Sequence, residues 1–420
     1  MQIAKLAVIA SVLLGFSPTA GTQSLDEKWS RCVDFNADVS IGGCTAIIQA
    51  GTETNSGLAV AFFKRGIAYQ KKGQYDRSVQ DFDQAIRLNP DYAPSFINRG
   101  ISYSGEGRYD RAIQDYDRAI RLKCDVEEPF YNRGNAYLYQ GQYDRAIQDY
   151  DRAIELQSDD DGAFNNRGNA YLYQGQYDRA IRDYDEAIRL NPDSTHALNG
   201  RGLAYSNQGQ YDRAIQDFDR AIRLEPDYAS AFNNRGDAYR CQGQCDRAIQ
   251  DYDQAIRLKP NYANAFRNRG YVRFCLAHFA DAAADFQNGL SLTPSDAYAV
   301  LWLHLAKARA GQDDAQAFAQ RAGQIDSSKW PAPVVNLFLG RLTPEQTLAA
   351  AGGPGTIKER GQNCEAEFFI AEYLLLGQEA PEALVHFGAA RETCPHNLVE
   401  YQGAAAEVAR LGTGAESGKK

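Results

Sequence analysis

The stretch NRGNAYLYQGQYDRAIQDYDRAI, from Asn132 to Ile154, returns almost unchanged from Asn166 to Ile188 as NRGNAYLYQGQYDRAIRDYDEAI. The dipeptide Arg-Gly inside it recurs every 34 residues, at Arg65-Gly66, Arg99-Gly100, Arg133-Gly134, Arg167-Gly168, Arg201-Gly202, Arg235-Gly236 and Arg269-Gly270. Seven occurrences in register indicate tandem copies of one structural unit.

Apolar and small residues within each unit follow a helical spacing. With the glycine of the dipeptide numbered as position 8, they fall at positions 4, 8, 11, 17, 20, 24 and 27, and a second glycine near position 15 interrupts them. In the third unit these residues are Phe130, Gly134, Tyr137, Tyr143, Ala146, Tyr150 and Ala153, with Gly141 at the interruption. The pattern predicts two antiparallel helices, A and B, in each unit. One such hairpin cannot bury both of its faces, so the units are expected to stack on one another.

This pattern resembles the tetratricopeptide repeat in its period and in its small-residue positions, over residues 59–296. The resemblance implies an all-α fold, a right-handed superhelix (α-solenoid) with N- and C-terminal capping helices. We expect a helical cap at 25–58, seven tandem units at 59–296 and a degenerate eighth unit at 297–330, where His304 replaces the glycine. A C-terminal helical block with a repeat-like hairpin is expected at 331–411, and a disordered tail at 412–420.

The C-terminal block is similar to the end of the bacterial outer-membrane tetratricopeptide lipoprotein family. The similarity lies in LFLGRLTPEQ (337–346), in a hairpin that ends in CPHN (394–397) and in the following VEYQGAAAEVARL (399–411). Members of that family are adaptors that bring envelope proteases and peptidoglycan hydrolases together, so the resemblance implies partners of this kind. No cysteine in the first 24 residues could carry the lipid, and we expect no stable membrane anchor.

Residues 1–24 have the order of a secretory signal peptide. Lys5 precedes the apolar run LAVIASVLLGF, and the small and turn-forming residues SPTAGTQS follow it. The run is shorter than the roughly 20 apolar residues that span a bilayer. We therefore expect cleavage between Ala20 and Ser24 and a periplasmic or secreted protein. A buried first helix is the alternative.

The composition excludes several classes of function. A chain of 420 residues with a formal net charge of -9 lacks the basic surface that nucleic-acid binding requires. No metalloprotease, P-loop or nucleophile-elbow motif occurs, and the histidines are scattered at His196, His278, His304, His386 and His396. We expect a protein that is not an enzyme and that uses no cofactor or metal.

Eight cysteines are typical of a chain that folds in an oxidising compartment. Cys32 and Cys44 flank one short helical hairpin, and Cys364 and Cys394 flank another. We expect both pairs to form disulfides, with free buried thiols as the alternative.

A second group combines Cys241, Cys245, Cys275 and His278 at the turns of adjacent units. Three outcomes are open: a Cys245–Cys275 disulfide, free thiols, or a zinc site. Cys124, in the position that proline occupies in most units, is expected to be a lone thiol.

A charged pair recurs in seven units. The arginine at position 7 is accompanied by an aspartate at position 23: Asp81, Asp115, Asp149, Asp183, Asp217, Asp251 and Asp285. In the eighth unit both are lost together, as Leu303 and Ala319. Joint loss indicates that they pair, because removing one partner would leave a buried charge uncompensated. The pattern does not say whether pairing lies within or between units. Ligand binding by these arginines is the alternative.

An asparagine ladder occupies position 6, at Asn98, Asn132, Asn166, Asn234 and Asn268, and is interrupted by Lys64 and Gly200. Helix A should present this position to the concave groove, where an amide can bond both the N–H and the C=O of an extended peptide. The ladder looks like that of the tetratricopeptide domain of the O-GlcNAc transferase, which implies a grip on peptide backbone. Further groove residues are expected at Tyr131, Asn135, Tyr139, Asn165, Asn169, Tyr173, Asn199, Asn233 and Asp237. The alternative is that each asparagine caps a helix or is solvated.

These observations predict an exported scaffold or adaptor that binds a protein or an extended peptide in its groove, within the cell envelope. The alternative from another class is a secreted binding module for a small ligand or a glycan. The sequence does not define the oligomeric state.

Overall fold

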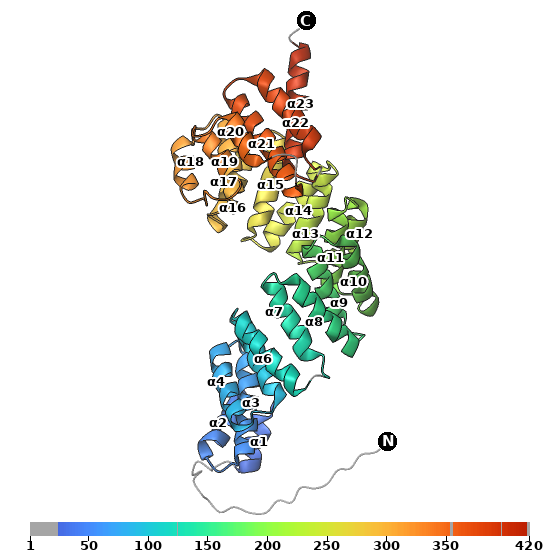
Figure 1. Ribbon diagram of the computed structural model, residues 1–420, viewed down its shortest axis with the longest axis vertical. Helices are drawn as coiled ribbons and strands as arrows, with labels where there is room; N and C mark the ends of the chain where they lie inside the picture. The colour runs from blue at the N-terminus through green and yellow to red at the C-terminus, as the bar shows by residue number, and fades with distance from the viewer. Residues whose placement is uncertain (1–23, 124, 353–355, 396, 418–420) are drawn as a thin grey trace, which may run out of the picture. The chain divides into compact units, whose positions relative to one another are not determined.

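The computed structural model describes residues 24–123, 125–352, 356–395 and 397–417. The regular structure of these residues consists of 23 α-helices without a strand, which confirms the predicted all-α class (Figure 1). The predicted signal peptide, except Ser24, and the predicted lone thiol Cys124 lie outside the described residues. The chain divides between Ser158 and Asp159 into two compact units, which are described separately.

The first unit contains an N-terminal helix pair followed by three repeat hairpins. Its helices are α1 (Leu25–Cys32), α2 (Ala37–Ala50), α3 (Asn55–Lys71), α4 (Tyr75–Leu88), α5 (Ala93–Gly105), α6 (Tyr109–Leu122), α7 (Glu128–Tyr139) and α8 (Tyr143–Leu156). Hairpins α3/α4, α5/α6 and α7/α8 correspond to the first three sequence repeats.

The second unit continues with hairpins α9 (Asp161–Tyr173)/α10 (Tyr177–Leu190), α11 (Thr195–Asn207)/α12 (Tyr211–Leu224), α13 (Ala229–Cys241)/α14 (Cys245–Leu258) and α15 (Ala263–Cys275)/α16 (Phe279–Leu292). The pair α17 (Ala297–Arg309)/α18 (Ala315–Ala322) follows. The C-terminal block contains α19 (Ala332–Phe338), α20 (Pro344–Ala351), α21 (Ile357–Leu376), α22 (Ala380–Thr393) and α23 (Val399–Ser417). Helix α23 extends to Ser417, beyond residue 412, where we expected the disordered tail to begin.

In the first six repeats two glycines have different physical roles, and in the seventh Ala277 stands at position 15. The glycine at position 15 takes a left-handed conformation between helices A and B, with φ of 72° at Gly141 and 74° at Gly209, which costs little without a Cβ atom. The glycine at position 8 makes room for the aromatic ring at position 24 of helix B. A Cβ atom on Gly202 would lie 2.6 Å from Cε1 of Phe218. The two helices of a hairpin can therefore pack with the ring between them.

The hydrophobic core of the repeats is built from the predicted positions. Ala214, Phe218 and Ala221, at positions 20, 24 and 27 of the fifth repeat, are fully buried. Positions 20, 24 and 27 are also buried in the remaining six repeats. Alanines allow close approach of the helices, and the rings fill the space between them.

Each arginine at position 7 holds the aspartate at position 23 of its own repeat in a bidentate ion pair. The Nε and Nη2 atoms donate to the two carboxylate oxygens over 2.5 to 3.0 Å in all seven repeats. The seven aspartates are between 1% and 7% exposed. Burial raises the pKa of Asp115, and its bonds with Arg99 oppose that shift. The predicted pairing is thus present, within each repeat.

The same guanidinium also reaches the preceding repeat. Nη1 of Arg201 donates to Asp185 over 2.6 Å, and Nη1 of Arg235 donates to Asp219 over 2.6 Å. Equivalent bonds join Arg99 to Asp83, Arg133 to Asp117 and Arg269 to Asp253. These second aspartates occupy position 25, which the sequence analysis did not single out. The arginines therefore pair both within and between repeats.

We call the ion pairs between the arginines at position 7 and the aspartates at positions 23 and 25 the charge lattice. At each end of it, uncharged residues replace the charged ones. Arg65, in the first repeat, donates through Nη1 to the hydroxyl of Thr45 on α2. The seventh repeat has Gln287 at position 25, and the eighth has Leu303 at position 7 and Ala319 at position 23. Loss of the arginine thus accompanies loss of both of its aspartates.

Disulfides Cys32–Cys44 and Cys364–Cys394 form as predicted, with Cα atoms 4.4 and 5.0 Å apart. The first joins α1 to α2, and the second joins α21 to the end of α22. Helix α23 packs against α15, and α21 packs against α17 (Figure 1). Their shared core surrounds Trp302, which is fully buried and contacts Phe274, Phe368 and Phe369.

Among the described residues, no helix has both the length and the apolar character needed to cross a membrane.

We predict that the Arg201–Asp217 pair is strongly coupled energetically. Replacing Asp217 by alanine leaves a guanidinium that is four-fifths buried with Asp185 as its remaining partner, and should lower the free energy of unfolding by on the order of 3 kcal/mol. The double variant R201L/D217A reproduces the pair found in the eighth repeat and should lose less stability than the two single variants combined. Urea unfolding of all four proteins measures the coupling. Asp227→Ala, at an exposed turn residue, is the control, and strictly additive losses would contradict the prediction.

Candidate functional site

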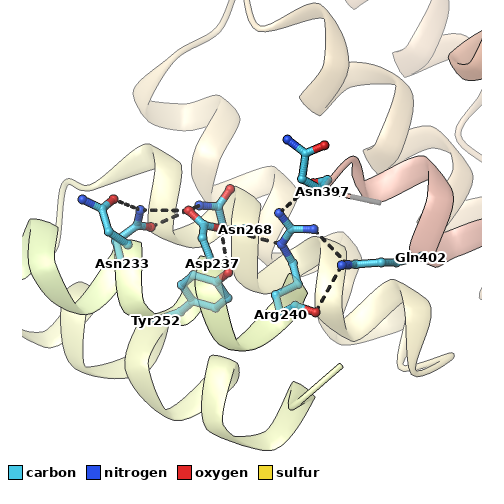
Figure 2. Close-up of polar contacts among 8 residues, drawn as sticks. Asn233, Asp237, Arg240, Tyr252, Asn268, Asn397 and Gln402 are labelled. Atoms are coloured by element: carbon cyan, nitrogen blue, oxygen red, sulfur yellow. Dashed lines mark hydrogen bonds and ion pairs between the residues drawn. The ribbon is translucent and has the colours of Figure 1, made fainter. Parts of the chain in front are cut away.

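The A helices of the second unit carry an interconnected set of four amide side chains and one carboxyl group, which we call the amide network: Asn199, Asn233, Asn234, Asp237 and Asn268. Asn234 Nδ2 donates to Asn199 Oδ1 over 2.9 Å, which links α13 to α11. Asn268 Nδ2 donates to Asn233 Oδ1 over 3.2 Å and to Asp237 Oδ2 over 3.1 Å, which links α15 to α13 (Figure 2). Positions 5, 6 and 9 of successive repeats thus form one polar surface.

Three of the predicted groove residues at position 9 accept hydrogen bonds from their own repeat. The tyrosine hydroxyl at position 24 donates to the side chain at position 9: Tyr150 to Asn135 and Tyr184 to Asn169, each over 2.7 Å, and Tyr252 to Asp237 over 2.8 Å. Where position 24 is phenylalanine, in the first, fifth and seventh repeats, position 9 is Ile67, Leu203 or Tyr271. Part of the polarity predicted for peptide binding therefore satisfies buried hydroxyl groups.

The remaining ladder residues differ in their surroundings. Asn98 donates to the Pro94 carbonyl one turn earlier in its own helix α5, which is neither a helix cap nor a bond across repeats. Asn166 accepts from Asn165 over 3.0 Å. Asn132 is half-buried, and no other described residue bonds to its side chain.

The predicted aromatic groove residues differ in exposure, and the interruption of the asparagine ladder has a steric cause. Tyr139 and Tyr173 are 72% and 64% exposed, and the Tyr131 ring lies 6.1 Å from that of Tyr150. The ladder is interrupted at Gly200 because a Cβ atom there would lie 2.6 Å from Cε1 of Tyr184.

A pocket of about 670 Å³ opens beside the amide network. Asn233, Asn234, Asp237 and Asn268 line it, together with Arg240 of α13, Arg267 and Tyr271 of α15, Tyr298 of α17, Glu365 of α21 and residues 397–400 before and within α23. The C-terminal block thus forms one wall of the pocket, and the repeats form the other.

Arg240 ties the two walls together. Its Nη1 donates to Gln402 Oε1 over 2.9 Å and its Nη2 to the Asn397 carbonyl over 3.3 Å, while Gln402 Nε2 donates back to the Arg240 carbonyl over 3.1 Å (Figure 2). Its Nε lies 3.7 Å from Asp237 Oδ1. Arg240 therefore joins the amide network to the C-terminal block.

Three carboxylates line this pocket. Burial raises the pKa of Asp237, and Arg240 and the Tyr252 hydroxyl oppose the shift. Burial raises the pKa of Glu400 to about 8, with a further contribution from the negative charge of Glu365. Burial also raises the pKa of Glu365, which accepts hydrogen bonds from Trp330 Nε1 over 2.6 Å and from the Tyr298 hydroxyl over 2.8 Å.

Six residues of this pocket were not among the predicted site residues: Arg240, Arg267, Tyr271, Tyr298, Glu365 and Glu400. Two of them had a detectable signal. Arg240 is the sole charged residue at position 12 among the seven repeats, and Arg267 is the sole charged residue at position 5. These exceptions to the repeat mark the helices against which the C-terminal block packs.

The cysteines near this site are free thiols. Cys241, Cys245 and Cys275 form no disulfide, so the Cys245–Cys275 bond is not made in this structure. Burial raises the pKa of the Cys275 thiol to about 12, which disfavours the thiolate needed for disulfide exchange. Over the described parts of the chain, no three His, Cys, Asp or Glu side chains are placed to hold a metal ion, so the zinc alternative is not formed either.

A buried charge cluster anchors α23 behind the pocket. Arg309 of α17 donates to Glu372 of α21 over 2.9 Å and to Glu407 of α23 over 3.2 Å, and Arg410 also pairs with Glu407. Glu372 and Glu407 are at most 2% exposed. Burial raises the pKa of Glu372 to about 7, because Arg309 compensates only part of the desolvation.

We predict that the C-terminal block loses stability as the pH rises from about 5 to 8. In the folded state Glu372 and Glu400 release their protons near pH 7 and pH 8, whereas in the unfolded chain they release them near the ordinary pKa of 4.5. Glu372→Gln should reduce this loss, with a difference of at most about 1.4 kcal/mol per pH unit. Urea unfolding followed by Trp302 fluorescence at pH 5.5 and 8 measures it. Glu392→Gln, at an exposed residue, is the control, and parallel losses in wild type and Glu372→Gln would contradict the assignment.

Family models match the chain continuously from residue 59 to residue 274. Models described as tetratricopeptide repeat match 59–92, 82–114, 165–229, 200–263 and 233–274, and a model described as TPR repeat matches 103–141 and 134–175. No curated protein matches the chain.

Solved structures with the same fold include a tetratricopeptide repeat protein from Parabacteroides merdae, with 22% identity, 59% of this chain and 98% of that chain covered, and a TM-score of 0.51. YrrB, described as a TPR protein with an unusual peptide-binding site, has 26% identity, coverage of 44% and 96%, and a TM-score of 0.37. PilF of Pseudomonas aeruginosa has 18% identity and a TM-score of 0.45, and the match covers 51% of this chain and 97% of that chain.

Stacked helical hairpins with a polar A-helix surface define this molecule as an α-solenoid repeat protein. With just over half of its length matched by models of one repeat type, the chain belongs to the tetratricopeptide repeat family.

Proposed function

We propose that this protein is a scaffold or adaptor that binds an extended segment of a partner protein along its A helices. The observation that carries the proposal is the amide network, in which Asn199, Asn234, Asn233 and Asn268 link three successive A helices beside an open pocket. The hydrogen bonds between these amides can be replaced by hydrogen bonds to a peptide backbone, because each amide has both donors and an acceptor. Such a surface holds a chain without selecting each of its side chains.

We further propose that the protein acts in the cell envelope after export. The proposal is supported by the order of residues in the first 24 positions and by two disulfides, which are typical of oxidising compartments. The C-terminal block adds the resemblance to outer-membrane adaptors of envelope proteases and peptidoglycan hydrolases. Those enzyme classes are the partners that we propose to test first.

A second candidate is binding of a small ligand or glycan, which the pocket volume favours. A pocket of about 670 Å³ lies within the range of small-molecule sites. Such a ligand would contact the pocket walls and not Asn166, which does not line the pocket. Asn166→Ala should therefore weaken a bound peptide segment and leave a small ligand unaffected.

The ladder prediction can be tested with the triple variant N166A/N234A/N268A. The partner segment would first be located by photo-crosslinking in native envelope extracts and then synthesised as a peptide. Each lost hydrogen bond to a desolvated peptide group contributes on the order of 1 kcal/mol, so peptide affinity should fall about a hundredfold. Isothermal titration calorimetry measures this affinity.

The matched control for this experiment is N261A/N288A, which removes two exposed asparagines outside the amide network. It should leave affinity unchanged. If the triple variant instead shows a lowered melting temperature with unaltered affinity, the asparagines serve the fold and the proposed groove is wrong.

Export predicts a shortened mature chain. The protein purified from its native host should begin between residues 21 and 25, because cleavage is expected after the small residues that follow the apolar run. Intact-mass spectrometry measures the start directly. Retention of residues 1–20 in the mature protein would remove the export proposal.

A further inference from the structure

Two neighbouring carboxylates stand at the C-terminal wall of the pocket without a cationic partner of their own. Glu400, in the first turn of α23, is 3% exposed and lines the pocket. Glu365, from α21, lines it too and accepts bonds from Tyr298 and Trp330. Neither carboxylate forms an ion pair with any described residue, and no other described residue donates a hydrogen bond to Glu400. The donor that reaches Glu400 is its own backbone N–H, so the cost of burying this carboxylate is compensated in part only.

The two guanidinium groups of the pocket are already engaged elsewhere. Arg240 bonds Gln402 and the Asn397 carbonyl and lies 3.7 Å from Asp237. Arg267 bonds Asp296 over 2.7 Å and Asn264 over 3.3 Å. Their charges are therefore matched by Asp237 and Asp296, and neither guanidinium is left to form an ion pair with Glu365 or Glu400.

The chemistry of this wall favours a cation that also donates hydrogen bonds. A lysine ammonium has three donors on a flexible apolar stem, and the stem can contact the rings of Tyr271 and Tyr298, which line the same pocket. Aromatic ring faces also attract cations. The amide network begins beside this wall, so a peptide held by the amides could place a side chain there.

We propose that the pocket binds the ammonium group of a lysine side chain from the partner segment, with Glu400 and Glu365 as its anionic contacts. This inference rests on the proposed function and specifies the chemistry of the segment that is bound. It predicts partners with a lysine in the extended stretch that the A helices hold.

Binding should be coupled to release of a proton. The charged and titratable groups around Glu400 are Arg240 on α13, Tyr271 on α15, Tyr298 on α17 and Glu365 on α21, and Asp237 lines the same pocket. Burial raises the pKa of Glu400 to about 8, and an adjacent ammonium favours the ionised carboxylate. Affinity should therefore increase as the pH rises from 6.5 to 8.5, where lysine remains protonated.

The test uses the full chain and capped tripeptides. Acetyl-Ser-Lys-Ser-amide is compared with the same peptide carrying norleucine, which keeps the methylene stem and lacks the ammonium group, and with butylamine, which lacks the peptide backbone. Calorimetric titration should show at least tenfold tighter binding of the lysine peptide than of the norleucine peptide. Butylamine binding as tight as the lysine peptide would overturn the assignment to a peptide side chain.

The variants Glu400→Gln and Glu365→Gln should each reduce the lysine preference to less than threefold. Glutamine retains an acceptor oxygen for the Trp330 and Tyr298 donors, so the wall should keep its structure, and unchanged melting temperatures would verify this. Glu382→Gln, at an exposed residue of α22, should keep the full preference. Lys358→Met should also keep it, because Lys358 lines a neighbouring pocket that shares Glu365 and does not line this one.

A preference that survives both glutamine variants, or equal binding of lysine and norleucine peptides, would overturn the inference. This failure is distinguishable from failure of the proposed function. The amide variants N166A/N234A/N268A test the grip on the backbone, and the carboxylate variants test selection of the side chain. Loss of long-peptide affinity in the amide variants without any lysine preference would leave the scaffold proposal intact and remove the cation site.

Discussion

The arginine at position 7 is the residue on which the stacking of this array depends. Its guanidinium binds one aspartate in its own helix B and a second in the preceding helix B, as Arg235 binds Asp251 and Asp219. The Arg235 and Asp251 side chains are largely buried, whereas the Asp219 side chain is 37% exposed. Loss of Arg235 or Asp251 alone would therefore leave a buried charge uncompensated. The planar fork of donors also fixes orientation, which a lysine could not do. Within each of the two units, these bonds hold a hairpin in register with its predecessor.

This register is what makes a recurring binding surface possible. Because successive A helices are placed alike within the second unit, positions 5 and 6 of one repeat come within hydrogen-bonding distance of the next, as Asn234 and Asn199 show. The same regularity limits the surface. The Tyr184 ring excludes a side chain at Gly200, and the Tyr252 hydroxyl takes one oxygen of Asp237. The amide network is therefore a compromise between satisfying buried groups and offering open ones.

The sequence determines most of the fold and little of the pocket, for a physical reason. Periodic positions report local packing, so glycine, alanine and aromatic residues predict the hairpins, and the joint loss at Leu303 and Ala319 predicts the ion pair. The disulfides follow from cysteines that flank short hairpins. The pocket requires Arg240 and Gln402, 162 residues apart, to meet, and no periodicity reports a contact made by one non-repeating block. Departures from the repeat at Arg240 and Arg267 are the sole trace of it in the sequence. Of its three carboxylates, Asp237 was a predicted groove residue, whereas Glu365 and Glu400 lie outside the repeats.

The C-terminal block ends the array by a different kind of packing. Where the charge lattice stops, Trp302 and the rings around it provide an apolar core, yet this block also buries Glu372, Glu400 and Glu407. Glu372 and Glu407 are held by Arg309, and they account for the docking of α23. Glu400 has no such role in the fold, and an apolar residue of similar size would be less costly there. Sites that violate the rules of stable packing tend to be functional. Glu372 and Glu407, which pair with Arg309, therefore anchor the C-terminal block, whereas Glu400, which has no ion-pair partner, belongs to the wall proposed to bind the lysine.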